Sequence, residues 1–498
     1  MTDLLLGIDV GTYSSKGVVV QTDGTVVASH IVEHEMSIPK PSWAEQDADA
    51  VWWSDVVEIC QTLLADDAVT ADDIKGAAFS AIGPCMLPVN KDGIPLRPGI
   101  LYGVDARASD EIDWLNEQYD AKSIFDFSGM ALTSQAVGPK ILWMRRNEPE
   151  LWEQVAHVMT ASSYLVYKMT DQITMNYHEA SHYIPLIDMK TMQWSERFAE
   201  HIIDIDKLPR LLWSNKVAGH ITDAAAVETG LPAGIPVAAG AVDALSEAIS
   251  VGAVNSGDMM NMYGSTAFFI VVLDEPVHDQ TVWSVAGAFE GQYNLAAGMS
   301  TTGSLTRWFR DELASGVDYD TLFEEADSVT PGANGLVMIP YFSGERTPIN
   351  DPHARGVVAG LTLSHSRWHI YRAILESVAY GIRHNLETFA EIGAKIDRII
   401  AVGGGTKTRT WLQIVSNVAA VEQLVPEKTI GASYGDAFLA GMAAGLLNRD
   451  DLDAWVKIEQ KIEPDSSHRA IYNELYKNYK ALYEQTTDIV HTLRRFDT

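Results

Sequence analysis

The chain has 498 residues, 47% of them hydrophobic, which is enough to bury large cores and favours two or more domains. Its formal net charge of -31 at pH 7 argues against nucleic-acid and membrane partners, because those surfaces require clustered Lys and Arg. The two cysteines, Cys60 and Cys85, are too few for a disulfide scaffold or a cysteine-ligated zinc site, and no signal or transmembrane segment is found, so we expect a cytoplasmic protein.

The first predicted element is a hairpin. An apolar strand over Leu4–Val10 ends in a turn and continues into a second apolar run at 18–20. The turn is made of small and polar residues and one cation, Gly11, Thr12, Ser14 and Lys16. Its glycine lets the backbone approach an anion, and successive N–H groups form a concavity that suits phosphate oxygens. Asp9, at the end of the first strand, is placed to hold a cation beside those phosphates.

Strands and helices then alternate along the chain. Strands are predicted at 76–79, 236–239, 259–263, 336–340 and 398–402, and helices at 50–64, 371–392 and 410–420. This alternation is typical of an α/β fold with helices packed on sheets. The small-residue stretch 238–253 is the predicted domain boundary, and a small-residue helix there would let two domains approach closely and pivot. A surface helix is expected over 466–498.

Asp243 follows the predicted strand at this boundary, where open α/β sheets bind ligands at the carboxyl ends of their strands. A lone aspartate after a strand is more often a helix cap. A second hairpin supports the catalytic interpretation, because residues 259–270 again run strand, Gly264-Ser265-Thr266, strand. One such turn is usually only a turn, whereas two suggest duplicated halves facing each other across a nucleotide. Asp243 would then accept the proton of an attacking hydroxyl.

Gly403, Gly404 and Gly405 form a third glycine cluster between the strand 398–402 and the helix that begins near Thr410. Backbone without Cβ atoms lets a flat group such as adenine lie against it, and a helix N-terminus favours an anion. In isolation a tight strand-to-helix turn would be the better explanation of this cluster.

Together these motifs resemble the FGGY family of carbohydrate kinases, and within it the xylulokinases. The segments that carry the resemblance occur in family order over residues 3–445: Gly7–Thr12, Trp43–Asp47 with Trp52-Trp53, Pro139–Trp143, Ala238–Asp243, Gly344–Pro348, and Gly403–Gly405 with Trp411.

The resemblance implies an α/β fold of two actin-like (ribonuclease H-like) domains with ATP and sugar in the cleft between them. Residues 1–247 would form the mainly sugar-binding domain and 248–498 the nucleotide-binding domain with its helical tail. Asp243 matches the catalytic base, and Asp9 and Asp243 the Mg²⁺ site. The expected ATP-binding residues are Gly11, Thr12, Ser14, Lys16, Gly264, Ser265, Thr266, Gly303, Gly403, Gly404, Gly405 and Lys407, with Gly435 and Asp436 nearby.

Departures from the family pattern fall on the sugar side. The expected substrate residues are Gly83, Pro84, Asp105, Arg107, Asn176 and Asp243. Pro84 stands where xylulokinases carry a substrate-contacting histidine, and Asn176 replaces an aspartate. We therefore expect D-xylulose to be a poor or secondary substrate, unless Asp105 or His178 supplies the missing contact.

The expected function is ATP-dependent phosphorylation of a hydroxyl of a sugar or sugar derivative, with ATP and Mg²⁺ required and a homodimer as the expected assembly. One alternative keeps the class and changes the acceptor to an aldonate, a deoxyketose or a polyol such as gluconate or erythritol. Another changes the class to a nucleotide-dependent sensor or chaperone-like ATPase on the actin-like fold.

Overall fold

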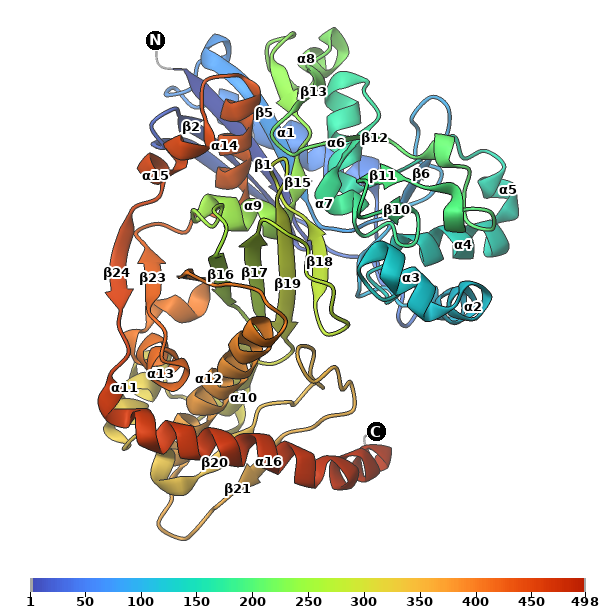
Figure 1. The fold of residues 1–498 in the computed structure, drawn as a ribbon. Coiled ribbons are helices and arrows are strands. Elements are labelled where there is room, and N and C mark those ends of the chain that lie inside the picture. The colour runs from blue at the N-terminus through green and yellow to red at the C-terminus, as the bar shows by residue number, and fades with distance from the viewer. Residues whose placement is uncertain (1–2, 497–498) are drawn as a thin grey trace.

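A computed structural model describes residues 3–496 and contains two α/β halves, one above the other in Figure 1, each built around a seven-stranded sheet. The α/β architecture predicted from the sequence is confirmed. In spatial order the first sheet consists of β13 (Val217–His220), β14 (Pro236–Ala238), β5 (Ile74–Ala81), β1 (Leu4–Val10), β2 (Ser14–Gln21) and β3 (Val26–Glu33), with β15 (Ala241–Val242) also paired to β5.

The second sheet repeats the pattern of the first. It consists of β18 (Trp283–Ala286), β19 (Tyr293–Met299), β17 (Ala267–Leu273), β16 (Asp258–Tyr263), β22 (Arg398–Val402), β23 (Gln423–Pro426) and β24 (Ile458–Ile462). In the first sheet β1 and β2 form an antiparallel hairpin, β3 continues it, and β5 runs parallel to β1. β16, β17, β19 and β22 have the same relations in the second. The duplicated hairpins predicted from the sequence therefore occupy equivalent places.

The other strands pair two by two, and helices cover the sheets. The strand pairs are β4 (Glu45–Gln46) with β7 (Gly99–Ile100), β6 (Leu87–Val89) with β8 (His157–Met159), β9 (Thr174–Asn176) with β12 (Arg210–Leu212), β10 (Ile187–Asp188) with β11 (Gln193–Trp194), and β20 (Val337–Ile339) with β21 (Val357–Ala359). In the first half the helices are α1 (Ser54–Leu64), α2 (Ser109–Tyr119), α3 (Ala121–Ser128), α4 (Val137–Asn147), α5 (Pro149–Trp152), α6 (Ala161–Thr170), α7 (Tyr177–Ala180) and α8 (Asp223–Thr229).

Two further helices lie between the halves, and the second half has its own set. The connecting helices are α9 (Asp243–Ser250) and α14 (Ala432–Ala443). The second half contains α10 (Gly303–Leu313), α11 (Tyr319–Ser328), α12 (Arg367–Glu391), α13 (Arg409–Ala419) and the expected C-terminal helix α16 (Arg469–Leu493). The short helix α15 (Leu452–Trp455) lies beside α14 and the β2–β3 turn (Figure 1). A π-helical segment, Ala48–Trp53, precedes α1, so the predicted helix 50–64 is two helical segments in sequence.

α9 is the small-residue helix predicted at the boundary, and it packs on both sheets. Leu245 and Ile249 join a core with strand residues of the first sheet, whereas Ala248 joins a cluster with strand residues of the second. α14 comes from the C-terminal half, yet it packs against β1, β5 and α9 (Figure 1). A Cβ atom on Gly435 would lie 2.0 Å from the Ser246 carbonyl oxygen, so α9 and α14 approach each other as closely as they do because this position is glycine.

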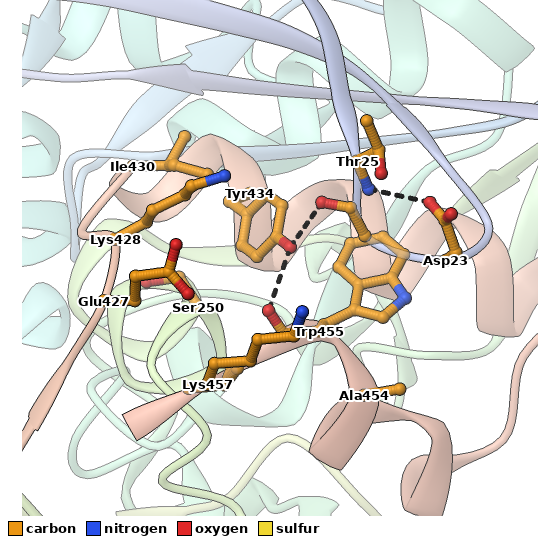
Figure 2. Close-up of a pocket in the computed structure, with 12 residues that line it drawn as sticks. Asp23, Thr25, Ser250, Glu427, Lys428, Ile430, Tyr434, Ala454, Trp455 and Lys457 are labelled. Atoms are coloured by element: carbon orange, nitrogen blue, oxygen red, sulfur yellow. Dashed lines mark hydrogen bonds between the residues drawn. The ribbon is translucent and has the colours of Figure 1, made fainter. Parts of the chain in front are cut away.

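α14 and α15 also hold the turn between β2 and β3. The Tyr434 hydroxyl donates to the Gly24 carbonyl at 2.7 Å, and the Trp455 indole N–H donates to the Thr22 carbonyl at 3.0 Å. Figure 2 shows Tyr434 and Trp455 beside a cavity of about 120 Å³, which is also lined by Ser250 of α9 and by Glu427, Lys428 and Ile430. None of the site residues predicted from the sequence lines this cavity. It lies where the chain passes between the halves.

Within residues 3–496, no helix combines the length and the apolar composition that crossing a lipid bilayer requires.

Candidate active site

The first predicted phosphate turn is tightly organised. The Gly11 amide donates to the Ser14 carbonyl at 2.9 Å, which closes the turn between β1 and β2. Gln46 donates to the Thr12 carbonyl at 2.9 Å, and the Thr12 hydroxyl lies 3.3 Å from the Tyr102 hydroxyl. The turn is thus braced by side chains from two other segments of the first half.

Lys16 lies directly opposite Asp9 in the β1–β2 ladder. Its ammonium group donates to the Ile430 carbonyl in the loop before α14. Burial lowers the pKa of Lys16, while the charges of Glu247 and Asp9 oppose that shift. The cation predicted to bind phosphate therefore lies among carboxylates at the junction of the two halves.

Asp243 is the first residue of α9, directly after β15. Its Oδ1 accepts a hydrogen bond from the Ala244 amide at 2.6 Å. Burial, together with the charges of Asp9, Glu247 and Glu179, raises the pKa of Asp243 to about 8. Burial also raises the pKa of Asp9 to about 6, against the Ser80 hydrogen bond and the charge of Lys16. The structure therefore brings Asp9 and Asp243 within electrostatic reach of each other.

A buried hydrogen-bond chain orients Asp9, and sequence reasoning missed its middle member. Ser80 lies 2.9 Å from Asp9 Oδ1 and 2.6 Å from Asp436 Oδ2, and Ser246 donates to Asp436 Oδ1 at 2.6 Å. Burial and the charge of Asp9 raise the pKa of Asp436 well above its ordinary value. The Ser80 hydroxyl therefore connects the carboxyl groups of Asp9 and Asp436. No local pattern marks Ser80, which directly follows the apolar stretch 76–79 of β5.

The second predicted phosphate turn packs against the start of α10. The amides of Thr302 and Ser304 donate to the Ser265 carbonyl at 3.1 and 3.0 Å, and the Gly303 amide donates to the Gly264 carbonyl at 3.0 Å. A Cβ atom on Gly303 would lie 2.5 Å from the Gly264 carbonyl oxygen. The glycine is therefore required for this contact, which joins the β16–β17 turn and α10 into one wall.

This wall borders a cavity of about 570 Å³ in the second half. The cavity is lined by Tyr263, Gly264, Ser265, Gly303, Thr306, Arg307, Tyr319, Asp320, Phe323, Gly404, Gly405, Lys407, Thr408 and Trp411. Six of the residues predicted to bind nucleotide therefore meet here, from three separate segments of the chain. Glycine backbone and aromatic rings make flat surfaces, which suit a purine base. Sequence reasoning missed Tyr319 and Phe323 of α11, because aromatic residues on a predicted helix are usually interpreted as part of the hydrophobic core.

Gly403 and Thr266, also predicted to bind nucleotide, do not line this cavity. Gly403 has φ 92°, and its Cβ position is 2.8 Å from the Tyr263 carbonyl oxygen. Glycine is therefore required at this position for the conformation of the turn and for its close contact with β16.

Asp105 and Arg107, predicted to bind substrate hydroxyls, form a buried ion-pair network. Both side chains have no exposed surface. The Arg107 guanidinium donates to Asp105 at 2.7 Å and to Glu45 at 2.8 Å, and it lies 4.0 Å from the centre of the Trp43 ring. Their hydrogen-bonding groups are thus used within the protein, and a direct contact with substrate stays a prediction for both.

Of the other predicted substrate residues, Gly83 lies next to Val242, the residue before Asp243. A Cβ atom on Gly83 would lie 2.8 Å from the Val242 side chain. Asn176 is fully buried and caps α7 through the Glu179 amide at 2.9 Å. His178 Nδ1 donates to the Ala286 carbonyl at 2.8 Å, and burial lowers the pKa of His178 to about 4, so this ring is neutral and already engaged.

Comparisons with known proteins cover almost the whole chain. The model of the FGGY family of carbohydrate kinases matches with its N-terminal domain at residues 4–250 and its C-terminal domain at 259–444. A xylulose kinase from Staphylococcus epidermidis is 27% identical, with 99% of this chain and 98% of that protein covered. A gluconokinase from Bacillus licheniformis is 27% identical, with 97% and 94% covered. The crystal structure of xylulose kinase from Rhodospirillum rubrum has a TM-score of 0.92 at 29% identity, with 98% and 100% covered.

Proposed function

Because the chain belongs to the FGGY family of carbohydrate kinases, we propose that it transfers the γ-phosphoryl group of ATP to a hydroxyl of a sugar or sugar derivative, with Asp243 as the general base. The observation that carries this proposal is the position of Asp243 at the junction of the two halves, within electrostatic reach of the β1–β2 hairpin. Family membership makes the chain a carbohydrate kinase, and the nucleotide sensor or chaperone-like ATPase is therefore excluded.

In the proposed reaction the acceptor hydroxyl loses its proton to the Asp243 carboxylate as its oxygen forms a bond to the γ-phosphorus, and ADP leaves with the electrons of the broken P–O bond. A raised pKa suits this role, because a stronger base takes the hydroxyl proton more readily. The backbone amides of the two glycine turns would hold the phosphates, and the aromatic and glycine-lined cavity would hold adenosine. Positioning and charge stabilisation then supply most of the rate enhancement.

The carboxylates of Asp9 and Asp243 fit a magnesium ion that arrives with ATP. Residues 3–496 contain no group of three or more His, Cys, Asp or Glu side chains that could hold a metal by themselves. Mg²⁺ is usually held by one or two carboxylates together with substrate phosphates, so this pair of side chains agrees with that mode. When bound, the ion would neutralise part of the phosphate charge.

A panel of acceptors tests the proposal. ATP consumption is measured with no acceptor and then with ketopentoses, aldonates and polyols. A kinase shows little turnover alone and a large stimulation by one compound. Slow turnover that no compound of the panel raises would contradict the assignment of a sugar acceptor.

A further inference from the structure

Glu179 has two oxygen atoms in very different surroundings. It lies on the short helix α7, where Asn176 fixes the helix start. Its Oε2 receives three hydrogen bonds, from Asn176 Nδ2 at 2.6 Å, from the Thr160 hydroxyl at 2.9 Å and from the Ser162 hydroxyl. These donors hold the carboxylate in one orientation.

The other oxygen, Oε1, has no partner among the described residues, although the side chain has no exposed surface. It lies 3.3 Å from the Cβ position of Gly83, and the Val242 side chain is 2.8 Å from that same position. Glu179 is also among the charges that raise the pKa of Asp243. Buried polar atoms are almost always paired. We therefore expect this oxygen, which is held near Val242 at the end of the strand before Asp243, to form a hydrogen bond with a bound molecule.

We propose that Glu179 Oε1 contacts a hydroxyl of the acceptor and that it selects uncharged polyhydroxy acceptors over aldonates. This inference rests on the proposed kinase function and names the acceptor class for the same site. The carboxylate lies three residues beyond Asn176, whose side-chain amide orients it.

The charges around the site favour an uncharged acceptor. The strongest charge effects on Asp243 come from carboxylates, those of Asp9, Glu247 and Glu179. Three cations of this part of the molecule are engaged with protein groups: Arg107 pairs with Asp105 and Glu45, Lys140 donates to two backbone carbonyls, and Lys16 donates to the Ile430 carbonyl. An acceptor carboxylate would therefore meet like charge without a free cation among these side chains.

A hydroxyl has no such conflict. It donates to an ionised carboxylate and accepts from a protonated one, and burial raises the pKa of Glu179 to about 7, so both forms are present near neutral pH.

The test uses Glu179→Gln and Glu179→Ala in the full chain, with Glu111→Gln as the matched control. Glu111 is likewise a buried carboxylate with a pKa raised by burial, but it pairs with Arg146 on α4. We measure kcat/KM for ATP, for gluconate, for the best neutral acceptor and for deoxy analogues of that acceptor.

In the wild type, one deoxy analogue should be about tenfold to a hundredfold poorer than its parent, because it leaves Oε1 unpaired. Glu179→Ala should erase that difference by lowering the parent alone. Glu179→Gln removes the charge and should raise the ratio of gluconate to neutral acceptor by about tenfold or more. The KM for ATP should stay within about twofold in both variants, and Glu111→Gln should leave every ratio unchanged.

The proposal is overturned if the wild type prefers gluconate, or if the deoxy penalty and the gluconate ratio are the same in Glu179→Gln as in the wild type. Should Glu179→Ala fail to fold, the Gln variant alone decides, because its amide still accepts from Thr160 and Ser162. A wild type that phosphorylates no acceptor at all would instead overturn the proposed function.

Discussion

The pKa of Asp243 is strongly raised, and its carboxylate accepts a hydrogen bond from the neighbouring Ala244 amide. We predict that Asp243→Asn lowers sugar phosphorylation by about a hundredfold or more, because the amide keeps the shape and cannot accept the proton. ATP and acceptor binding should stay within about tenfold, since the substitution removes no side-chain volume. A coupled assay of ADP release measures the turnover, and calorimetric titration measures the binding of ATP and of the acceptor. More than a tenth of wild-type turnover in the variant would show that another group is the base.

The pH profile should report the same residue. A carboxylate acts as a base only when ionised, and its pKa in this site is raised above the ordinary 3.8, to about 6 for Asp9 and about 8 for Asp243. kcat/KM should therefore rise with pH, with an apparent pKa between about 6 and about 8 that belongs to the pair.

Glu247→Gln tests whether the acid limb of this pH profile belongs to Asp243. Glu247 raises the pKa of Asp243, so removing its charge should move the acid limb to lower pH. An acid limb near pH 4 in the wild type, or a limb that Glu247→Gln leaves in place, would contradict the assignment.

D-xylulose should be a poor or secondary substrate, as the sequence predicts from Pro84 and Asn176. The structure supports this expectation at two alternative contacts, because Asp105 is paired with Arg107 and His178 donates to a backbone carbonyl. An unpaired acceptor hydroxyl costs about 1–3 kcal/mol, or roughly tenfold to a hundredfold in kcat/KM. Comparison across ketopentoses and polyols decides the point, and a wide preference for D-xylulose would refute it while leaving the kinase assignment intact.

At the scale of single elements, the contact between α9 and α14 depends on glycine. We predict that Gly435→Ala lowers the free energy of unfolding by about 1–3 kcal/mol, because its Cβ would lie 2.0 Å from the Ser246 carbonyl and backbone must move. Gly441→Ala, on the same helix, is the matched control: its Cβ would meet the ends of the Leu447 and Leu5 side chains, which can rotate away. Urea unfolding of the two variants measures the difference, and equal effects would mean that the close approach of α9 and α14 is not required.

At the scale of the whole molecule, α14 and α15 should move with the first half when the kinase closes on its substrates. They contact β1, β5 and the β2–β3 turn, while the loop 427–431 connects α14 to the second sheet. Spin labels at Thr25 and Ala454, which border the cavity in Figure 2, should keep their distance when an ATP analogue and acceptor bind. Labels at Ala454 and Lys395 should change theirs.

The buried Cys60 and Cys85 leave the engineered cysteines as the reactive ones. The opposite result, a changed Thr25–Ala454 distance with a constant Ala454–Lys395 distance, would assign α14 and α15 to the second half.

The sequence by itself determined the two glycine hairpins, the boundary helix and the position of Asp243 after a strand, because turn chemistry and strand patterns are properties of a few consecutive residues. It also determined the family, whose motifs recur in order along the chain.

Tertiary structure alone decided which polar groups face each other. Asp436 reaches Asp9 through Ser80, α14 covers strands β1 and β5 from the start of the chain, and Glu179 is left with one unpaired oxygen. These outcomes depend on contacts between segments far apart in sequence, where burial and pairing are set by the packing of whole elements. For the same reason Arg107, which the motif marks as a substrate contact, forms its ion pairs inside the protein.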